Sequence, residues 1–508
     1  MSWSKIIGIL CASAIGLGVL FYAGENLRGK AAWEKFKKEW EAKGEVFDYR
    51  RIIPQPVPSQ DNFTHTPLLK PLLAHQWNAA NTEVLKEPDP AKIQRANDLM
   101  KFTGETPGLV QWRLGRSVDL AAWQTYFRDH TEWPNPKAAG QPAADILFAL
   151  KKYDAEFQEL TAAAKTRPRA RFDINYEATF AALLPHLTVL RKASKGFALR
   201  AVAHLSHDDS NAALADAQMG LFLAETIKDE PLLISQLVRI AMLEIALQPI
   251  WEGLKNNQWN AAQLELLENQ LGRIDMLQGY AIAIRGERDL ANLMIERMRE
   301  MPKKQLGQLM GNEGVPMHLI PTGWIYQNQK NINHLHVSFT LPVVDPKTRR
   351  IHPEFADQMD QHFSKPRRGP YNILANLLMP AVSRVGLRVG SAQTAVDHAQ
   401  IACRLARNKL NGTPIPPDLA GLNPALPQDP FTGKPYHYRR MGEHHYRLYS
   451  VGWNLKNEGG QPAFQNGSDQ LNFNQGDWVW QYTPVPLPSE NQPKKNPAEP
   501  AGPNTPKE

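Results

Sequence analysis

The clearest cluster of histidine and carboxylate side chains in the sequence is His204-x-x-His207-Asp208-Asp209. Metal phosphohydrolases bind a divalent metal through a His-Asp doublet and further His and Asp ligands on neighbouring helices, and His186 could supply one such ligand. The same residues also suit a turn between two helices, in which Asp caps the following helix and His ends the preceding one. We favour the turn, and a metal-dependent hydrolase that uses His204, His207 and Asp208 is the alternative.

Two further groups of histidines are weaker candidates for a site, and the first of them has no acidic partner nearby in sequence. His334-x-His336 lies in an alternating run, His334 to Val344 (HLHVSFTLPVV), which predicts a strand with both imidazoles on one face. Three more histidines flank a predicted hairpin turn, and we interpret them as solvated turn residues: His437, His444 and His445.

Signatures of the common catalytic classes are missing from the sequence. It has no phosphate-binding loop with Gly-Lys-Ser/Thr, no Gly-x-Gly-x-x-Gly after a strand, no His-Glu-x-x-His and no Gly-x-Ser-x-Gly. The two cysteines, Cys11 and Cys403, cannot form a disulfide framework or a multi-thiolate metal site. We therefore favour a function without catalysis and expect no bound cofactor, apart from the calcium considered below.

Length and charge exclude two further classes of protein. At 508 residues the chain is long enough for about three domains, so a small disulfide-stapled peptide is excluded. The 58 Lys and Arg against 51 Asp and Glu give a net charge of +7. This mild excess is not gathered in a basic stripe, so we expect no nucleic-acid partner.

The elements that carry the histidine cluster form a predicted helical array over residues 144–301. Proline is scarce there, and Ala, Leu and Ile recur every three or four residues. Short polar breaks with capping residues separate the stretches, so consecutive helices should pack as antiparallel neighbours. The predicted helices are Ile146 to Ala164, Tyr176 to Leu205, Asn211 to Ile227, Pro231 to Leu254, Ala261 to Gly272 and Leu277 to Met298.

One pair of these helices resembles a known repeat. The segment Leu199 to Glu230 has small Ala residues where two helices must approach closely, and a short polar turn between them. It resembles one tetratricopeptide-type helix pair, although no clear copies recur at the 34-residue period of that repeat. The resemblance implies a protein-binding helical surface, so we expect one or more protein partners on the array.

The N-terminus carries a predicted membrane anchor. Residues 6–24, after a short flank of residues 1–5, contain no charge and no proline, and they are long enough to cross a bilayer. A cleaved signal peptide is the alternative, but Phe21 stands where a signal peptidase site before Ala23 needs a small residue. We therefore expect an uncleaved, single-pass anchor with the bilayer as its partner.

The residues after the anchor leave two questions open. An amphipathic helix is predicted within residues 25–45, with Trp33, Phe36 and Trp40 on one face. This face could pack on its own domain or lie on the anionic headgroup surface, and the sequence does not decide between them. Basic residues such as Arg28 and Lys30 follow the anchor and favour a cytoplasmic body by charge count.

Proline-rich segments separate the other parts. Residues 46–143 are predicted to be a Pro-rich connector and mixed region, because dense prolines forbid long helices. Residues 302–370 are rich in Gly, Pro and His and predict a second connector. Residues 483–508 hold too few apolar side chains to offset the entropy of ordering, so this tail is predicted to be disordered.

Residues 371–482 predict a long helix followed by a small antiparallel sheet, with short strands at His437 to Arg440 and Tyr446 to Val451. From about Ala392 this region resembles the C-terminal part of the type II secretion major pseudopilin family. The matching elements are Asp429-Pro430, Gly433, Pro435-Tyr436, Tyr438 and Ser450-x-Gly452, ahead of a polar loop closed by Asp477. In that family the anchor opens directly into the long helix, whereas here the anchor lies far upstream.

The resemblance implies a calcium-binding loop. Calcium takes six to eight oxygen ligands from carboxylates and carbonyls. In this chain Asn454 stands where the family has aspartate, Leu455 where it has glycine, and Lys456 adds a repelling charge. The remaining candidate ligands form a degenerate loop, which we expect to fold without metal: Asn454, Glu458, Asp469 and Asp477.

Together these patterns predict a mainly α protein: a helical hairpin array, one N-terminal transmembrane helix and a small C-terminal α+β module. We expect a membrane-anchored scaffold of a bacterial-type cell envelope that binds proteins and serves as an accessory to a secretion or pilus-like system. The pseudopilin resemblance implies an inner (cytoplasmic) membrane protein with an extracytoplasmic body, against the charge count. An envelope metal-dependent hydrolase is the alternative.

Overall fold

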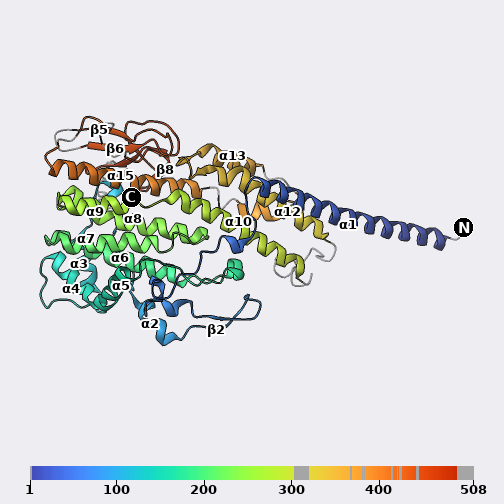
Figure 1. Ribbon diagram of the computed structural model, residues 1–508, viewed down its shortest axis with the longest axis horizontal. Helices are drawn as coiled ribbons and strands as arrows, with labels where there is room; N and C mark the ends of the chain where they lie inside the picture. The colour runs from blue at the N-terminus through green and yellow to red at the C-terminus, as the bar shows by residue number, and fades with distance from the viewer. Residues whose placement is uncertain are drawn as a thin grey trace, which may run out of the picture.

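The computed structural model shows a mainly helical protein, with 59% helix and 8% strand (Figure 1). Its strands form small antiparallel sheets only, within the residues that the structure describes. Those residues are 3–301, 320–365, 369–379, 382, 384–413, 416–419, 422, 426–441 and 446–488.

Helix α1 (Trp3–Ala42) begins outside the body of the protein and ends inside it (Figure 1). Residues 3–21 are all exposed, and their most apolar window has a mean hydropathy of 2.3. Gly29, Trp33 and Phe36, further along the same helix, are buried. The predicted anchor and the predicted amphipathic helix are therefore one continuous helix, because no proline or capping residue interrupts it.

The predicted array is present as a series of packed helices. The last four helices of the array begin and end within two residues of the predicted boundaries: α7 (Ser210–Glu225), α8 (Leu233–Lys255), α9 (Ala261–Leu271) and α10 (Met276–Glu300). Local caps fix them, since Asp209, Asn260 and Asp275 each accept a hydrogen bond from a backbone amide of the following helix.

Earlier in the array two boundaries differ from the prediction. The stretch from Ile146 is split by a 3-10 turn at Lys151–Tyr153 into α4 (Pro142–Leu150) and α5 (Asp154–Thr166). The next helix, α6 (Pro185–Ser206), begins nine residues later than predicted, at a proline whose fixed φ suits a first helical turn. A 3-10 turn at Tyr176–Ala181 precedes it.

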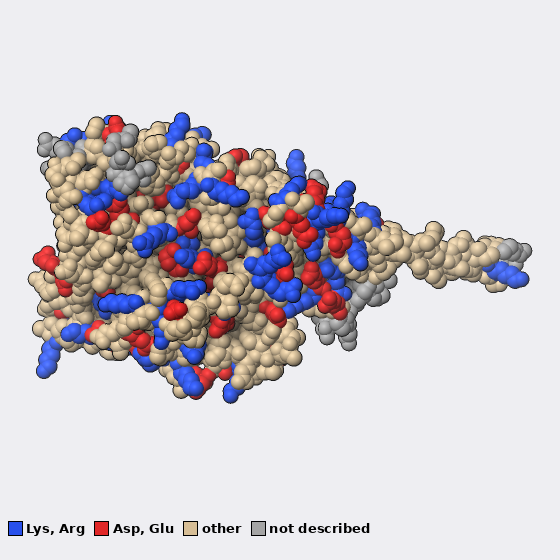
Figure 2. Space-filling view, in the orientation of Figure 1, with Lys and Arg blue, Asp and Glu red and all other residues tan. Residues whose placement is uncertain are grey.

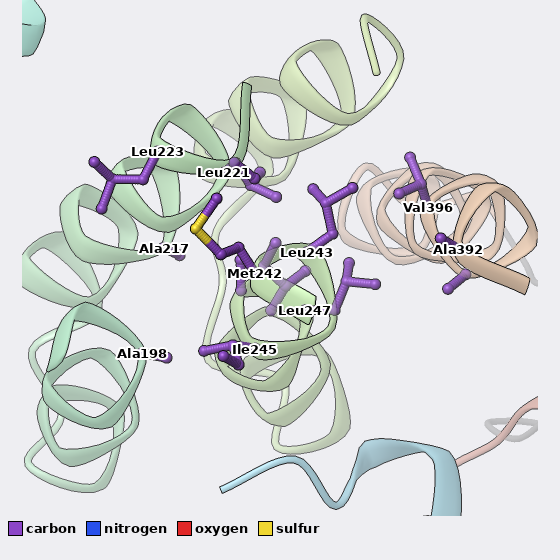
Figure 3. Close-up of a cluster of buried hydrophobic side chains, with 14 of the residues drawn as sticks. Ala198, Ala217, Leu221, Leu223, Met242, Leu243, Ile245, Leu247, Ala392 and Val396 are labelled. Carbon is purple, nitrogen blue, oxygen red and sulfur yellow. The ribbon is translucent and has the colours of Figure 1, made fainter. Parts of the chain in front are cut away.

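The main core lies where α8 passes between α7 and α15 (Val385–Leu410), as Figure 3 shows. Met242 and Leu221 meet between α8 and α7, and Leu243 and Leu247 face Val396 on α15. Helix α8 is apolar enough to cross a membrane by composition, but 61% of its most apolar window is buried. Its apolar side chains therefore belong to the core.

Residues 46–143 contribute more to the core than a connector would. They contain α2 (Pro90–Asp98), α3 (Leu120–Asp129) and a hairpin of β1 (Gln76–Trp77) and β2 (Val84–Lys86). Phe63, Trp112 and Trp123 from this region are buried in the main core cluster. The prolines limit helix length here, as expected, while the large apolar residues between them pack against the array.

The predicted strand from His334 to Val344 is wrong. Helix α12 (Thr322–Leu335) ends inside it, followed by a π-helical turn (His336–Thr340) and a 3-10 turn (Leu341–Val343). Leu335 packs beside α10, whereas Val337 packs against α1 on another side. A helix buried on several sides gives an apolar pattern that periodicity cannot distinguish from a strand.

The described part of residues 302–370 is therefore helical rather than a connector. After the π-helical turn come a two-residue pair of strands, β3 (Val344–Asp345) and β4 (Arg350–Ile351), and then α13 (Pro353–Ser364). Helix α12 lies alongside α1, and α13 lies next to the π-helical turn.

The C-terminal part has the predicted layout of a long helix and a small sheet. The short helix α14 (Ile373–Leu378) precedes α15, so residues 371–410 form two helices and not one. Strands β5 (His437–Arg440), β6 (Tyr446–Ser450) and β9 (Trp478–Trp480) form an antiparallel sheet in the order β5-β6-β9. Strands β7 (Pro462–Phe464) and β8 (Leu471–Gly476) form a separate hairpin.

Most of the predicted disordered tail lies outside the described residues. Its first part, however, is packed on the body: the Val485 amide donates to the Leu114 carbonyl at 2.9 Å, and Val485 is buried. The sheet and this end of the chain lie at the end of the body away from the exposed part of α1 (Figure 1).

Candidate functional site

The inner half of α1 is tightly docked on α12. Trp33 and Phe36 are 4% and 7% exposed and pack with Val337. The Tyr22 hydroxyl donates to the Ile320 carbonyl at 3.1 Å, and the Gly323 amide donates to the Asn26 side chain at 2.9 Å. The aromatic face of this helix therefore packs on its own protein, and an interfacial helix lying on lipid headgroups is excluded for these side chains.

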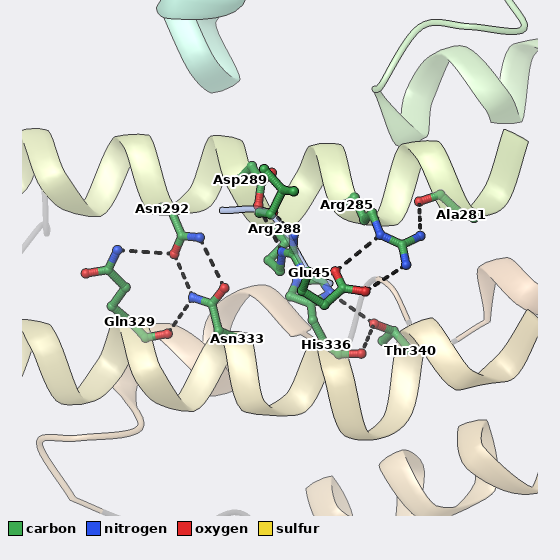
Figure 4. Close-up of polar contacts among 11 residues, drawn as sticks. Glu45, Ala281, Arg285, Arg288, Asp289, Asn292, Gln329, Asn333, His336 and Thr340 are labelled. Atoms are coloured by element: carbon green, nitrogen blue, oxygen red, sulfur yellow. Dashed lines mark hydrogen bonds and ion pairs between the residues drawn. The ribbon is translucent and has the colours of Figure 1, made fainter. Parts of the chain in front are cut away.

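A buried ion network begins three residues after α1 ends (Figure 4). Glu45 accepts hydrogen bonds from Arg285 at 2.8 Å and from Arg288 at 2.6 Å, both on α10. Arg288 is fully buried, and it also donates to the Asp289 carboxylate at 2.9 Å and to the Val46 carbonyl. These contacts fix the end of the anchor helix to the array.

The pKa values of the two carboxyl groups in this network shift in opposite directions. Burial raises the pKa of Glu45, but the hydrogen bonds and charges of Arg285 and Arg288 outweigh it, so this pKa lies below its ordinary value. Burial raises the pKa of Asp289 to about 6 despite the charge of Arg288. Glu45 is therefore already ionised over the pH range in which Asp289 titrates, and near neutral pH both carboxylates face the buried guanidinium.

Neutral groups extend the contact between α10 and α12 (Figure 4). The Asn333 amide donates to the Asn292 side chain at 2.6 Å, and the Gln329 amide donates to the same oxygen at 3.2 Å. His336 lies beside Thr340 within the π-helical turn, and burial lowers the pKa of His336 to about 3, so its imidazole is neutral. π-helical turns often occur at functional sites.

A pocket of about 1500 Å³ adjoins this network. Its walls come from the segment after α1, the loop after α5, the C-terminal end of α7, one face of α10 and the residues from the 3-10 turn at Leu341–Val343 to α13. Two charged side chains of the pocket wall are held by ion pairs with residues that do not line the pocket. Arg285 binds Glu45, and Glu225 binds Arg239 at 2.6 Å. Arg239 is itself buried. The pocket combines a large volume with convergent polar groups, which makes it the candidate binding site.

The histidine cluster at the end of α6 lies in an inter-helix turn. His207 is the C-cap of α6, Asp208 has a left-handed φ of 58°, and Asp209 caps α7 by accepting from the Ala212 amide at 3.0 Å. Burial lowers the pKa of His204, whose Nδ1 lies 3.9 Å from the Asp209 carboxylate.

His186 does not join that cluster. It lies at the other end of α6, about 27 Å away along the helix axis. There it is fully buried and hydrogen-bonds Glu230 at 3.0 Å. Among the described residues no three His, Cys, Asp or Glu side chains come together to hold a metal ion.

Three of the four candidate calcium ligands lie together beside the C-terminal sheet. The Asn454 amide donates to Glu458 at 2.7 Å, and Asp477 accepts from the Gly460 amide at 2.6 Å. One oxygen of Glu458 and one of Asp477 are buried without a partner. Burial and the neighbouring charge of Glu458 raise the pKa of Asp477. Asp469 lies apart from this group in sequence, in the turn between β7 and β8.

The sequence did not reveal the ion network or the pocket. Their residues come from segments far apart in the chain, and the only local signal is Arg285-x-x-Arg288-Asp289 on an otherwise buried helix face. Charged residues on such a face are rarely fully buried unless paired, so this pattern points to a partner elsewhere.

The chain matches no known family model, and no curated protein or solved structure matches its sequence or fold.

Proposed function

We propose that this protein is a single-pass, membrane-anchored scaffold of a cell envelope whose helical body binds protein partners. The observation that carries the proposal is the exposed half of α1. Residues 6–24 carry no charge, all of them except Tyr22 are exposed, and 19 such residues extend about 28 Å, close to the hydrocarbon thickness of a bilayer. Figure 2 shows charged side chains gathered where α1 enters the body and almost none along its protruding part.

The anchor is retained rather than removed as a signal peptide. Signal peptidase cleavage near Ala23 would cut α1 just before the part that docks on α12, and it would remove Tyr22, which hydrogen-bonds Ile320. The same helix then runs without a break to Trp33 and Phe36 in a buried cluster. A segment that is built into the body in this way serves as an anchor.

The anchor holds the body at a fixed height and rotation above the membrane. No flexible linker separates the apolar part of α1 from the part packed on α12, and Glu45 fixes the next turn of chain to α10. Surfaces on the array therefore face a defined direction relative to the bilayer, which suits a scaffold that positions a partner.

The C-terminal module supports an accessory role in a secretion or pilus-like system. It combines the long helix α15 with a three-stranded antiparallel sheet, the layout implied by the pseudopilin resemblance. In this proposal the module contacts pseudopilin-like subunits, and the body is extracytoplasmic on an inner (cytoplasmic) membrane. The tetratricopeptide-like pair of α6 and α7 offers the array's protein-binding surface.

Membrane fractionation tests the anchor. The full chain should stay in the pellet after alkaline carbonate extraction, whereas the double variant Ile9→Arg, Leu17→Arg should be released, because each charge costs about 2.5–3.5 kcal/mol at a span centre. Leu85→Arg, at an exposed site of β2, is the matched control and should pellet normally. Recovery of wild type in the supernatant, or a mature chain that begins near residue 24, contradicts the proposal.

Two further measurements test the location and the role. Periplasm-specific and cytoplasm-specific reporters fused after Glu508 report the side on which the body lies. Crosslinking in intact membranes should capture a stable protein partner. Absence of any partner, together with turnover of a small substrate, would overturn the scaffold function.

A further inference from the structure

We propose that the pocket beside the Glu45 network binds an acidic peptide segment that also carries aliphatic side chains. This inference rests on the proposed scaffold function and deepens it by naming the chemistry of the partner. Three properties of the pocket support it: its size, its free charges and its apolar floor.

The size of the pocket fits part of a chain better than a small metabolite. Pockets for small molecules commonly enclose about 300–1,000 Å³. This pocket encloses about 1500 Å³ and is lined by five separate stretches of the chain. An extended segment of a partner protein can occupy a recess of this length and contact several walls at once.

The charges that line the pocket favour an anion. Six Arg and Lys side chains and three Asp and Glu side chains line it, an excess of three positive charges. Four of the cations are exposed and form no ion pair within the described ranges: Arg51, Arg169, Lys228 and Lys347.

The acidic groups cannot satisfy those cations. Glu225 is bound to Arg239, and Asp345 accepts hydrogen bonds from the Thr348 hydroxyl and from its own turn. Asp229, which is exposed, is the one acidic residue of the pocket whose carboxylate forms no ion pair or hydrogen bond with the described residues. Unpaired cations around a concave surface raise the local concentration of anionic ligands and speed their association.

The floor of the pocket identifies the kind of anion. It is formed by partly exposed aliphatic side chains, Ile53, Val57, Ile282 and Leu341, with two phenylalanines, Phe222 and Phe355. Binding gains free energy when the Leu, Ile or Val side chains of a ligand are buried against such an aliphatic surface. A single-stranded nucleic acid would instead call for aromatic side chains that stack on successive bases along a basic groove. Acidic residues that alternate with aliphatic ones match both the rim and the floor.

The test uses the full chain in nanodiscs of zwitterionic lipid and fluorescence anisotropy. The probe is a short fluorescein-labelled peptide in which Glu alternates with Leu, and a Lys/Leu peptide of equal length is the charge control. We expect saturable binding of the Glu/Leu peptide that weakens as salt increases. The double variant Arg169→Glu, Lys228→Glu should bind it about tenfold more weakly, equivalent to about 1.4 kcal/mol.

Matched variants separate pocket binding from general charge attraction. The double variant Lys434→Glu, Arg439→Glu makes the same charge change on the C-terminal module, outside the pocket, and should leave binding unchanged. Val57→Ser removes an aliphatic contact of the floor and should weaken binding without altering its salt dependence. Thermal unfolding of each variant shows whether the fold is retained.

Several outcomes would overturn the inference. They are equal binding of the Lys/Leu peptide, no binding of either peptide, an unchanged affinity in the Arg169→Glu, Lys228→Glu variant, and tighter binding of a labelled oligothymidylate or of soluble phosphatidylglycerol. Membrane fractionation of the wild-type chain is independent of the peptide, so a wild-type chain that pellets normally but binds neither peptide rejects the pocket assignment alone. Peptide binding by a chain that is released from membranes rejects the anchor alone.

Discussion

Gly29 of α1 and Gly323 of α12 are in backbone contact. A Cβ atom added to Gly29 would lie 2.2 Å from the carbonyl oxygen of Gly323, and one added to Gly323 would lie 1.9 Å from the carbonyl oxygen of Glu25. Neither glycine has a positive φ, so close approach is the reason for glycine at both positions. This contact allows the buried aromatic residues Trp33 and Phe36 to reach their neighbours, and it joins the anchor to the body.

Enlarging this contact should separate α1 from α12. We expect Gly29→Val to lower the free energy of unfolding by about 1–3 kcal/mol, because the side chain meets backbone that cannot rotate away. Gly24→Val is the matched control, since nothing lies within 4 Å of an added Cβ there. Thermal unfolding in detergent measures the difference, and an equal effect of the two variants would refute the close contact.

Removing the Glu45 carboxylate should destabilise the body far more than removing a surface carboxylate. Glu45→Gln removes one of the two carboxylates that bind the fully buried Arg288, and breaking a buried pair costs about 3–5 kcal/mol. Glu39→Gln removes an exposed pair with Lys43, which water and salt already screen, and should change the stability far less. Urea unfolding of both variants compares them, and similar midpoints would show that Arg288 is satisfied without Glu45.

Asp289 should make the stability depend on pH in a defined direction. Its pKa is raised from 3.8 to about 6 in the folded protein, so the folded state holds a proton that the unfolded state has lost. The Asp289 carboxyl group therefore destabilises the protein as pH rises from about 4 to about 6. Asp289→Asn keeps an oxygen for Arg288 and cannot titrate. Relative to wild type it should gain stability over this window, by about 3 kcal/mol. A difference that does not vary with pH would contradict the buried, protonated carboxyl group.

Local signals in the sequence predicted the parts of the fold that depend on local interactions. The starts of α7, α9 and α10 are predicted within one residue, because in each case a capping residue bonds to its own helix: Asp209, Asn260 and Asp275. The two strands of the C-terminal hairpin are likewise predicted within one residue.

Long-range packing determined what the sequence did not predict. The run after His334 alternates like a strand, yet it is helical because its apolar residues are buried against α1 on one side and α10 on another. Glu45 and Arg288 are 243 residues apart in the sequence, and no local pattern around either residue predicts that they form an ion pair. The pocket is missed for the same reason, since its walls meet only after the array has folded.

Leu455 should be a weak point of the C-terminal loop. It adopts a left-handed φ of 57°, which costs a residue with a Cβ about 1–2 kcal/mol, and its side chain is half exposed. Leu455→Gly should therefore raise the stability by about 1 kcal/mol. Leu266→Gly, at an equally exposed site within α9, should instead lower it by about 1 kcal/mol. Thermal unfolding distinguishes the two signs, and a loss in both variants would mean that the Leu455 side chain contributes packing.

The loop around Asp477 should fold without calcium. Three of its ligand-type side chains already have hydrogen-bond partners, because Asn454 binds Glu458 and Asp477 accepts from the Gly460 amide. Lys456 adds a positive charge in the same loop. We therefore expect calcium to leave the unfolding temperature of the wild type unchanged.

Asp477→Ala should lower that temperature equally with and without calcium, because it leaves the buried Gly460 amide unpaired at a cost of about 1–3 kcal/mol. A rise in unfolding temperature with calcium that disappears in Asp477→Ala would show instead that the two unpartnered oxygens of Glu458 and Asp477 bind the ion, as the pseudopilin resemblance implies.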